Sequence, residues 1–314
     1  MKNCKIFLSL IVLLISVSCR SEQPVRILFW NIQNGMWAEQ GENYDKFVNW
    51  VTLQNADICV WAEAQSNYKT GSKERLSDGE RYLVENLPEF AARYGHAYTY
   101  VGGHRDNFPQ AITSKYPIKN IERIVGEEPD SVVTHGCGWA QVEINKKVLN
   151  LVSVHTWPQR YAFRAQDTEA SKSRNEGDFY RKMEVEYILN HTVRKDENAN
   201  DNYWIMMGDL NSISRLDNEL KYNLPVDTTA FIVQDYILEN SPYIDIIKEK
   251  HPNEFKPTTL SQRRIDYIYC TQKAYDSIIW CDVIWDEYTS PVRDSLTRFC
   301  IPSDHLPIIV DLAL

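Results

Sequence analysis

Two polar side chains that follow an apolar stretch are the first residues of this sequence that could carry chemistry. Four apolar residues, Trp204 to Met207, run into Gly208, and Asp209 and Asn211 come after it. An apolar run bounded by a glycine is typical of a buried strand that ends in a turn, and α/β sheets tend to place ligands at the carboxyl ends of their strands. A carboxylate can take a proton from water, and a carboxamide can donate and accept hydrogen bonds. Because Asp and Asn are also ordinary turn formers, this stretch alone does not establish a site.

Similar polar residues lie at the ends of other apolar stretches along the chain. The full set is Asn31, Glu63, His155, Asp209 with Asn211, Asp266, and Asp304 with His305. These are side-chain types that bind hard metal ions and phosphate groups or transfer protons. A chance protein rarely places so many of them at the ends of apolar runs, so the pattern indicates an active site built where strands end.

The elements that would position these residues interleave strands and helices without a break in composition. Apolar runs predict strands at 25–32, 57–63, 97–101, 110–114, 118–124, 138–144, 148–155, 204–207, 264–270, 277–284 and 307–312. Helical spacing predicts helices at 44–53, at 81–94 with a proline that breaks it near its middle, and at 177–194, with Tyr180, Met183, Tyr187 and Ile188 on its apolar face. This order fits one α/β domain over residues 24–314.

Composition and charge limit the class of protein. The 314 residues are 43% hydrophobic and 25% charged, which is ordinary for a globular chain. The net charge of -9 provides no overall basic field for polyanions, so nucleic acid is a less favoured partner, although it is not excluded. The cysteines beyond residue 19 are Cys59, Cys137, Cys270, Cys281 and Cys300. They show no metal-binding spacing, and while one disulfide is possible, a disulfide scaffold is not indicated.

The first residues have the pattern of an export signal. Two lysines precede Ile6–Val17, an uncharged stretch that is too short to span a bilayer as a stable helix and ends just before Cys19. The small residue before Cys19 resembles a bacterial lipoprotein cleavage site. We therefore expect residues 1–18 to be a signal peptide and Cys19 to be acylated, which would anchor the protein in a bacterial cell envelope. Ser16 stands where such sites usually carry leucine, so a plain secretory peptide is the alternative.

Seven short motifs surround the polar residues at the strand ends. They are Phe29-Trp-Asn31-Ile, Val60-Trp-Ala-Glu63, Ala111-Ile-Thr-Ser-Lys-Tyr-Pro-Ile118, Val152-Ser-Val-His155-Thr, Met207-Gly-Asp209-Leu-Asn211-Ser, Arg264-Ile-Asp266-Tyr-Ile and Ser303-Asp304-His305-Leu-Pro. Together and in this order they resemble the DNase I-like endonuclease/exonuclease/phosphatase superfamily, over nearly the whole chain that follows the leader. The resemblance implies a four-layered α/β sandwich, two packed mixed β-sheets flanked by helices, with the site at one edge.

The resemblance also implies a metal and phosphate site. Glu63 is similar to the family's metal-binding glutamate, and Asn31 to the asparagine beside the metal and a phosphoryl oxygen. Asp304 would support the metal or the neighbouring histidine. Oxygen ligands of this kind suit Mg²⁺, which keeps several of its waters, with Mn²⁺ as a substitute. Arg105 is a further candidate for a phosphate contact, although a solvated loop arginine explains it equally well.

Catalytic roles follow from the same resemblance. Asp209 would orient and deprotonate the attacking water, and Asn211 would hold a phosphoryl oxygen. His305 would donate to the phosphoryl oxygens or transfer a proton, with Asp266 fixing its tautomer. His155 resembles the branch of DNase I, sphingomyelinases and inositol-phosphate phosphatases, where it contacts phosphate or acts as general acid. The abasic-site endonucleases carry tyrosine there.

Two other features have no assigned role. Segment 158–182 carries mixed charges and either covers the substrate or is a surface charge mixture. The remaining histidines, His96, His104, His135, His191 and His251, show no ligand spacing.

The sequence therefore predicts an exported, membrane-anchored, Mg²⁺-dependent hydrolase in which water attacks phosphorus directly, in line. A phosphomonoester or a small or lipid phosphodiester is the expected substrate. An extracellular nuclease is the alternative on the same fold, and a non-catalytic binding lipoprotein is the alternative from a different class.

Overall fold

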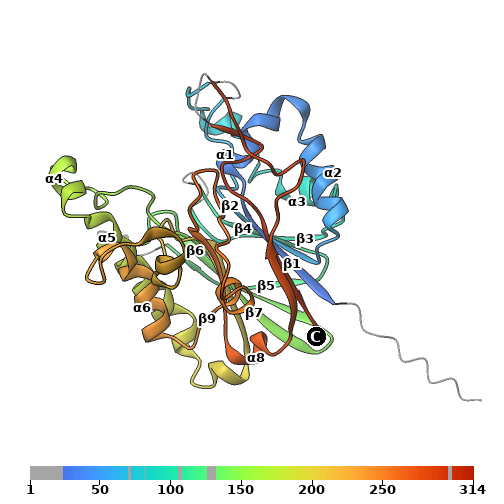
Figure 1. The fold of residues 1–314 in the computed structure, drawn as a ribbon. Coiled ribbons are helices and arrows are strands. Elements are labelled where there is room, and N and C mark those ends of the chain that lie inside the picture. The colour runs from blue at the N-terminus through green and yellow to red at the C-terminus, as the bar shows by residue number, and fades with distance from the viewer. Residues whose placement is uncertain (1–23, 70–71, 82, 105–107, 126–131, 296–298) are drawn as a thin grey trace, which may run out of the picture.

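The computed structural model describes residues 24–314 except 70–71, 82, 105–107, 126–131 and 296–298. The predicted signal peptide, Cys19 and Arg105 therefore lie outside the described residues. Two six-stranded sheets pack face to face, with helices on their outer surfaces (Figure 1). Within the described residues, no helix is both long enough and apolar enough to cross a membrane.

The first sheet has the strand order β11-β14-β1-β2-β4-β3. Its strands are β1 (Val25–Asn31), β2 (Ile58–Ala62), β3 (Tyr98–Val101), β4 (Ala111–Ser114), β11 (Ile278–Val283) and β14 (Ile308–Leu312). The second sheet has the order β5-β6-β7-β8-β10-β9. Its strands are β5 (Ile118–Ile124), β6 (Cys137–Ile144), β7 (Lys147–His155), β8 (Tyr203–Asp209), β9 (Ile244–Asp245) and β10 (Asp266–Cys270), while β12 (Val292–Arg293) pairs with β13 (Cys300–Ile301). The pairs β1–β2 and β7–β8 are parallel, so each sheet is mixed.

The helices connect the strands and cover the two sheets. They are α1 (Gln33–Met36), α2 (Asp45–Gln54), α3 (Leu87–Ala92), α4 (Thr168–Ser173), α5 (Glu176–His191), α6 (Ile232–Asn240), α7 (Ile246–Lys250) and α8 (Gln272–Tyr275). Short 3-10 helices occur at Trp37–Glu42, Asp78–Glu80, Val193–Lys195, Ala199–Asp201, Arg215–Asp217 and Thr229–Phe231, and a π-helix at Asn218–Tyr222. Helices α2 and α3 lie on one side of the molecule and α5 and α6 on the other (Figure 1).

Strand β1 shows why the sequences of the central strands are continuously apolar. Its side chains alternate between two faces. Ile27 and Phe29 belong to the core between the sheets, whereas Leu28 and Trp30 pack into the separate core beneath α2 and α3. A third core lies between the second sheet and α5 and α6. Both faces of the central strands are therefore buried, and the predicted four-layered α/β sandwich is confirmed.

The structure differs from the sequence-based predictions for several helices. The predicted helix at 81–94 is confined to α3, and Pro88 lies in its first turn, where proline initiates a helix rather than breaking it. In α5, Met183 is 52% exposed instead of lying on a buried face. Between 232 and 250 the structure forms α6 and α7, which the sequence patterns did not predict.

The five described cysteines are all buried and free, so none of them forms a disulfide.

Gly208 continues strand β8 instead of ending it. The strand extends to Asp209, and Gly208 pairs with Val154 of the parallel neighbour β7. A Cβ atom on Gly208 would lie 2.0 Å from the carbonyl oxygen of Val154. Glycine is therefore required by the close approach of the two strands.

We expect Gly208→Ala to lower the free energy of unfolding by about 2–4 kcal/mol, because the added methyl group must push β7 and β8 apart. Urea unfolding followed by circular dichroism measures the change. Gly41→Ala is the matched control, since no heavy atom lies within 4 Å of its Cβ position. Equal stability of the two variants would contradict this account of Gly208.

Candidate active site

The predicted site residues meet where the two sheets come together. Asn31 is the last residue of β1 and Glu63 directly follows β2, so both project from the first sheet. His155 and Asp209 end the paired strands β7 and β8, and they lie side by side in the register of the second sheet. Asp266 begins β10 directly opposite Asp209. Five residues separated by up to 235 positions in the sequence are thus neighbours in space.

The amide of Asn31 joins the two sheets. Its Nδ2 donates to Asp209 Oδ2 at 3.0 Å and to Glu63 Oε1 at 3.3 Å. Its Oδ1 accepts a hydrogen bond from the backbone N–H of Gln33 at 3.0 Å, which fixes the orientation of the amide. The side chain is fully buried. One carboxamide therefore sets the distance between the candidate metal ligand and the candidate base.

A left-handed turn holds both Asn31 and Glu63. All four residues of α1, Gln33 to Met36, have φ between 32° and 61°. Left-handed backbone costs L-residues about 1–2 kcal/mol each, and such strain is concentrated at functional sites. The turn aims the N–H of Gln33 at Asn31 and the N–H of Asn34 at Glu63 Oε2, 2.8 Å away. The strained backbone thereby places two N–H donors on the site.

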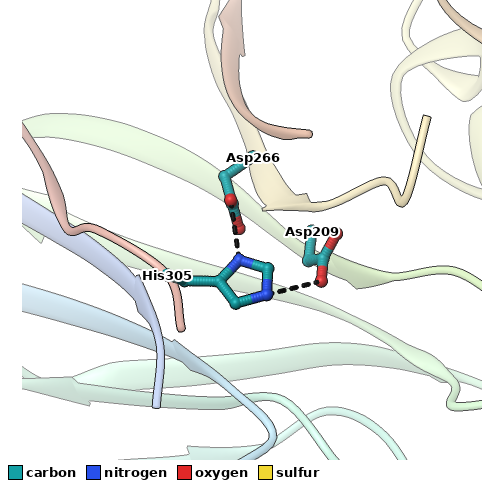
Figure 2. A group of neighbouring side chains, drawn as sticks. All are labelled: Asp209, Asp266 and His305. Atoms are coloured by element: carbon teal, nitrogen blue, oxygen red, sulfur yellow. Dashed lines mark hydrogen bonds and ion pairs between the residues drawn. The ribbon is translucent and has the colours of Figure 1, made fainter. Parts of the chain in front are cut away.

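His305 lies between two buried carboxylates (Figure 2). Its Nδ1 is 2.8 Å from Asp266 Oδ2, and its Nε2 is 3.7 Å from Asp209 Oδ2. Burial raises the pKa of Asp266 to about 6, against the lowering effect of His305. Burial also lowers the pKa of His305, but the carboxylates of Asp266, Asp304 and Asp209 outweigh it and hold the pKa well above its ordinary value. His305 is therefore a cationic donor at neutral pH, oriented by Asp266.

A second histidine, His155, also lies near Asp209. The distance from His155 Nε2 to Asp209 Oδ2 is 3.9 Å. Both imidazoles thus face the same carboxylate oxygen at distances longer than a direct hydrogen bond, which leaves room for a bridging water or phosphoryl oxygen. Asn211 donates its backbone N–H to Asp209 Oδ1 at 2.8 Å, and its Nδ2 donates to the carbonyl of Thr156.

His135 belongs to the site, although its position in the sequence gave no signal. Its ring stacks on His155 with centroids 4.3 Å apart and planes 18° apart. It is 4% exposed and precedes β6, so only the pairing of β6 with β7 brings it to the site. Sequence spacing relates residues along one element and cannot reveal such a contact.

A cavity of about 550 Å³ opens beside Glu63. Its lining residues are Gln33, Asn34, Glu63, Tyr68, Lys73, Phe108, Phe299 and Asp304. Burial raises the pKa of Glu63, and the charge of Asp304 raises it further. Among the described residues, no lysine or arginine forms an ion pair with either carboxylate. Lys73 lines the same cavity but is not ion-paired with Glu63 or Asp304, and two carboxylates facing one cavity in this way fit a divalent cation with oxygen ligands.

Most charges of segment 158–182 are already paired. Helices α4 and α5 occupy much of it, and Lys172 pairs with Glu169 and Arg174 with Glu176. This favours the surface charge mixture over a cover for the substrate. Arg160 lines a second cavity of about 290 Å³ beside Asn211, together with the ion pair of Asp178 and Arg181, and among the described residues it has no carboxylate partner of its own.

Glu184 of α5 fixes the backbone on both sides of the stacked histidines. It is fully buried. Its Oε1 accepts hydrogen bonds from the N–H and the hydroxyl of Thr134, and its Oε2 accepts one from the N–H of Trp157 at 2.8 Å. Burial raises the pKa of Glu184 from 4.5 to about 7, although these hydrogen bonds lower it. The loops that carry His135 and His155 are thus tied to one carboxyl group.

We expect the stability of the protein to depend on pH through Glu184. Because the folded state binds this proton more tightly than the unfolded chain does, the contribution is fully present below about pH 4.5 and is lost as pH rises through about 7. Between about pH 5 and about pH 8, the wild-type free energy of unfolding should therefore fall by about 2–3 kcal/mol relative to that of Glu184→Gln. Urea unfolding at a series of pH values measures the difference. The exposed Glu186 of α5 provides the control, Glu186→Gln; equal pH slopes for wild type and Glu184→Gln would disprove the assignment.

Solved structures of other proteins share this fold, and one sequence family matches the chain. An AP endonuclease from Archaeoglobus fulgidus superposes with a TM-score of 0.61 at 17% identity, covering 92% of this chain and 100% of that one. The 3′ phosphatase NExo from Neisseria, bound to product DNA hairpin, gives a TM-score of 0.58 at 14% identity, covering 92% and 99%. TDP2 from D. rerio, complexed with a single strand DNA product, gives 0.55 at 14% identity, covering 92% and 98%.

These identities are low, so the superpositions establish a common fold and leave the branch of the superfamily open. No curated protein sequence matches the chain significantly. The model of one family does match, over residues 28–305, which include every candidate site residue named above. The chain therefore belongs to the Endonuclease/Exonuclease/phosphatase family.

Proposed function

We propose that this protein is a divalent-metal-dependent phosphoester hydrolase that uses a water molecule as its nucleophile. The family and its structural neighbours are enzymes that hydrolyse phosphoesters. The observation that carries the proposal is the unbroken set of contacts from Glu63 through Asn31 to Asp209 and on to His305 and Asp266. A non-catalytic binding protein would have no need of this arrangement.

Asp209 is the group that orients and deprotonates the water. Hydrogen bonds from Asn31 and from the N–H of Asn211 hold its two carboxylate oxygens in place. His305 donates from Nε2 to a phosphoryl oxygen, and Asp266 keeps Nδ1 protonated and the ring oriented. The side chains of Asn211 and His155 contact the phosphoryl group from the second sheet. Water attacks phosphorus in line, and no covalent bond to the protein forms.

Glu63, Asn31 and Asp304 would hold the metal ion, for which Mg²⁺ is the first choice and Mn²⁺ a substitute. Asn31 Oδ1 accepts one N–H and retains a second lone pair for this purpose. The ion would neutralise charge that develops on the phosphoryl group and the leaving oxygen. Asp209, Asp266 and His305 also form a group with metal-binding composition. The raised pKa of His305 favours an imidazolium there, which is a poor ligand.

The substrate class that we propose is a phosphomonoester or a small or lipid phosphodiester. An extracellular nuclease is a second candidate, and one observation favours it. Arg160 and Arg263 line the cavity beside Asn211, and within the described residues neither guanidinium group has a carboxylate partner. Two such cations could hold a second phosphate of a longer substrate.

We expect Asp209→Asn and His305→Ala each to reduce kcat by about 10²–10⁴-fold while circular dichroism stays unchanged, because each removes a proton-transfer or donor group. Hydrolysis is measured with bis-p-nitrophenyl phosphate, sphingomyelin, inositol phosphates and plasmid DNA. Mg²⁺ should support turnover, and EDTA should abolish it reversibly. Asp227→Asn, at an exposed aspartate, is the control. Near-normal activity in either site variant refutes the assignment, and a folded protein that hydrolyses none of these compounds favours a binding protein instead.

We also propose that the protein is exported and anchored through acylated Cys19, on the strength of the leader sequence. Cells labelled with radioactive palmitate should yield a labelled protein, and Cys19→Ala should abolish the label. A plain secretory peptide would instead give unlabelled, released protein.

A further inference from the structure

Three aromatic side chains line one cavity beside the candidate metal ligands. Tyr68, Phe108 and Phe299, which we call the aromatic wall, all line the cavity that contains Glu63. The ring of Tyr68 is 5.8 Å from that of Phe299 and 6.4 Å from that of Phe108, centroid to centroid. The reacting phosphoester would therefore have an aromatic surface on one side.

The turn that positions the metal ligands also positions the aromatic wall. Gln33 Oε1 accepts a hydrogen bond from the N–H of Cys300 at 2.8 Å, next to Phe299. Asn34 Oδ1 accepts one from the N–H of Asn67 at 2.7 Å, next to Tyr68. The same two residues donate their backbone N–H groups to Asn31 and Glu63. The distance between the wall and the metal ligands is thus fixed by α1.

Trp37 and the backbone of Phe108 extend this support. The Trp37 ring contacts Phe299 edge to face at 4.9 Å, and its Nε1 donates to the carbonyl of Lys69. Phe108 has a φ of 51°, which is unfavourable for a bulky side chain. Its carbonyl lies 3.3 Å from His155 Nδ1 and accepts that N–H. A strained residue thus places its ring on the wall and its carbonyl on a catalytic histidine, which indicates a functional constraint.

The chemistry of the cavity narrows what can lie against the wall. The remaining lining side chains, Gln33, Asn34, Glu63, Lys73 and Asp304, are all polar. A long acyl chain would desolvate them without giving hydrogen bonds in return. A flat ring with polar edges satisfies both surfaces, because its face stacks on the aromatic wall while its edge meets the polar groups.

We propose that the aromatic wall binds a planar aromatic ring attached to the phosphoester, which makes the substrate a nucleoside or aryl phosphate ester. This inference rests on the proposed function and identifies the substrate class of that site. Lys73 at the same cavity can contact an anionic or carbonyl edge of the ring. Tyr68 and Phe299 are the residues that set the preference.

Isothermal calorimetry with Mg²⁺ and non-hydrolysable phosphonates tests the proposal without requiring turnover. Phenylphosphonate should bind about three- to tenfold more tightly than cyclohexylphosphonate, which is similar in size but not planar. Tyr68→Leu and Phe299→Leu should remove this preference and leave the affinity for methylphosphonate unchanged. Tyr98→Leu, which alters a 40% exposed tyrosine on β3, should keep the preference.

Each outcome decides the question. Equal affinity for the two ring compounds, or tighter binding of octylphosphonate, overturns the proposal even if a leucine variant fails to fold. A non-hydrolysable phosphonate analogue of thymidine 5′-monophosphate distinguishes the two sources of the ring, since binding tighter than that of phenylphosphonate indicates a nucleobase and weaker binding an aryl ester. A protein that prefers the aromatic ring but hydrolyses none of the tested compounds would support ring binding by the aromatic wall and refute the proposed hydrolase function. Failure of one proposal can therefore be distinguished from failure of the other.

Discussion

The hydrogen bond from Asn31 to Asp209 is the interaction on which the geometry of the site depends. It links the end of β1 in the first sheet to the end of β8 in the second, at a fully buried position. Packing between the sheets is apolar and non-directional, so it brings the strand ends together without fixing them to tenths of an ångström. A buried amide whose oxygen is held by Gln33 can do this, because its orientation is determined and its loss would leave polar groups unpaired.

Several carboxylates are buried close together at this junction. Glu63, Asp209, Asp266 and Asp304 converge on one edge of the molecule, and His305 is the cation that meets several of them. The raised pKa values of Glu63 and Asp266 express the cost of burying this charge. A divalent cation would relieve it on the Glu63 side, and the imidazolium relieves it on the Asp266 side. On the proposed function, such a division would supply the phosphoryl group with positive charge from both the metal ion and the imidazolium.

The sequence predicted the strands and the residues at their ends because both are local signals. An apolar run and the polar residue that follows it are adjacent in the chain, and Asn31, Glu63, His155 and Asp209 were found in this way. Asp266 instead begins β10, so the prediction that it ends a strand is wrong, and only its motif identified it. The need for Gly208 was misinterpreted as a turn, since the atom that excludes a side chain belongs to Val154 on another strand. Glu184, His135 and the aromatic wall were missed for the same reason. Their partners lie on other elements, and no periodicity within α5 distinguishes a buried carboxyl from an exposed one.

On the proposed function, the left-handed turn couples catalysis to substrate choice. Its backbone N–H groups hold Asn31 and Glu63, while the side chains of Gln33 and Asn34 hold the segments that carry Phe299 and Tyr68. A Cβ atom on Gly35 would lie 2.8 Å from the backbone of Gln65 and Ser66, so the turn cannot relax outward. Its strain is thus balanced by contacts that serve both the reacting centre and the aromatic wall. A substitution that eased the strain would shift the metal ligands and the wall together, so the protein cannot change its substrate through this turn without also changing its chemistry.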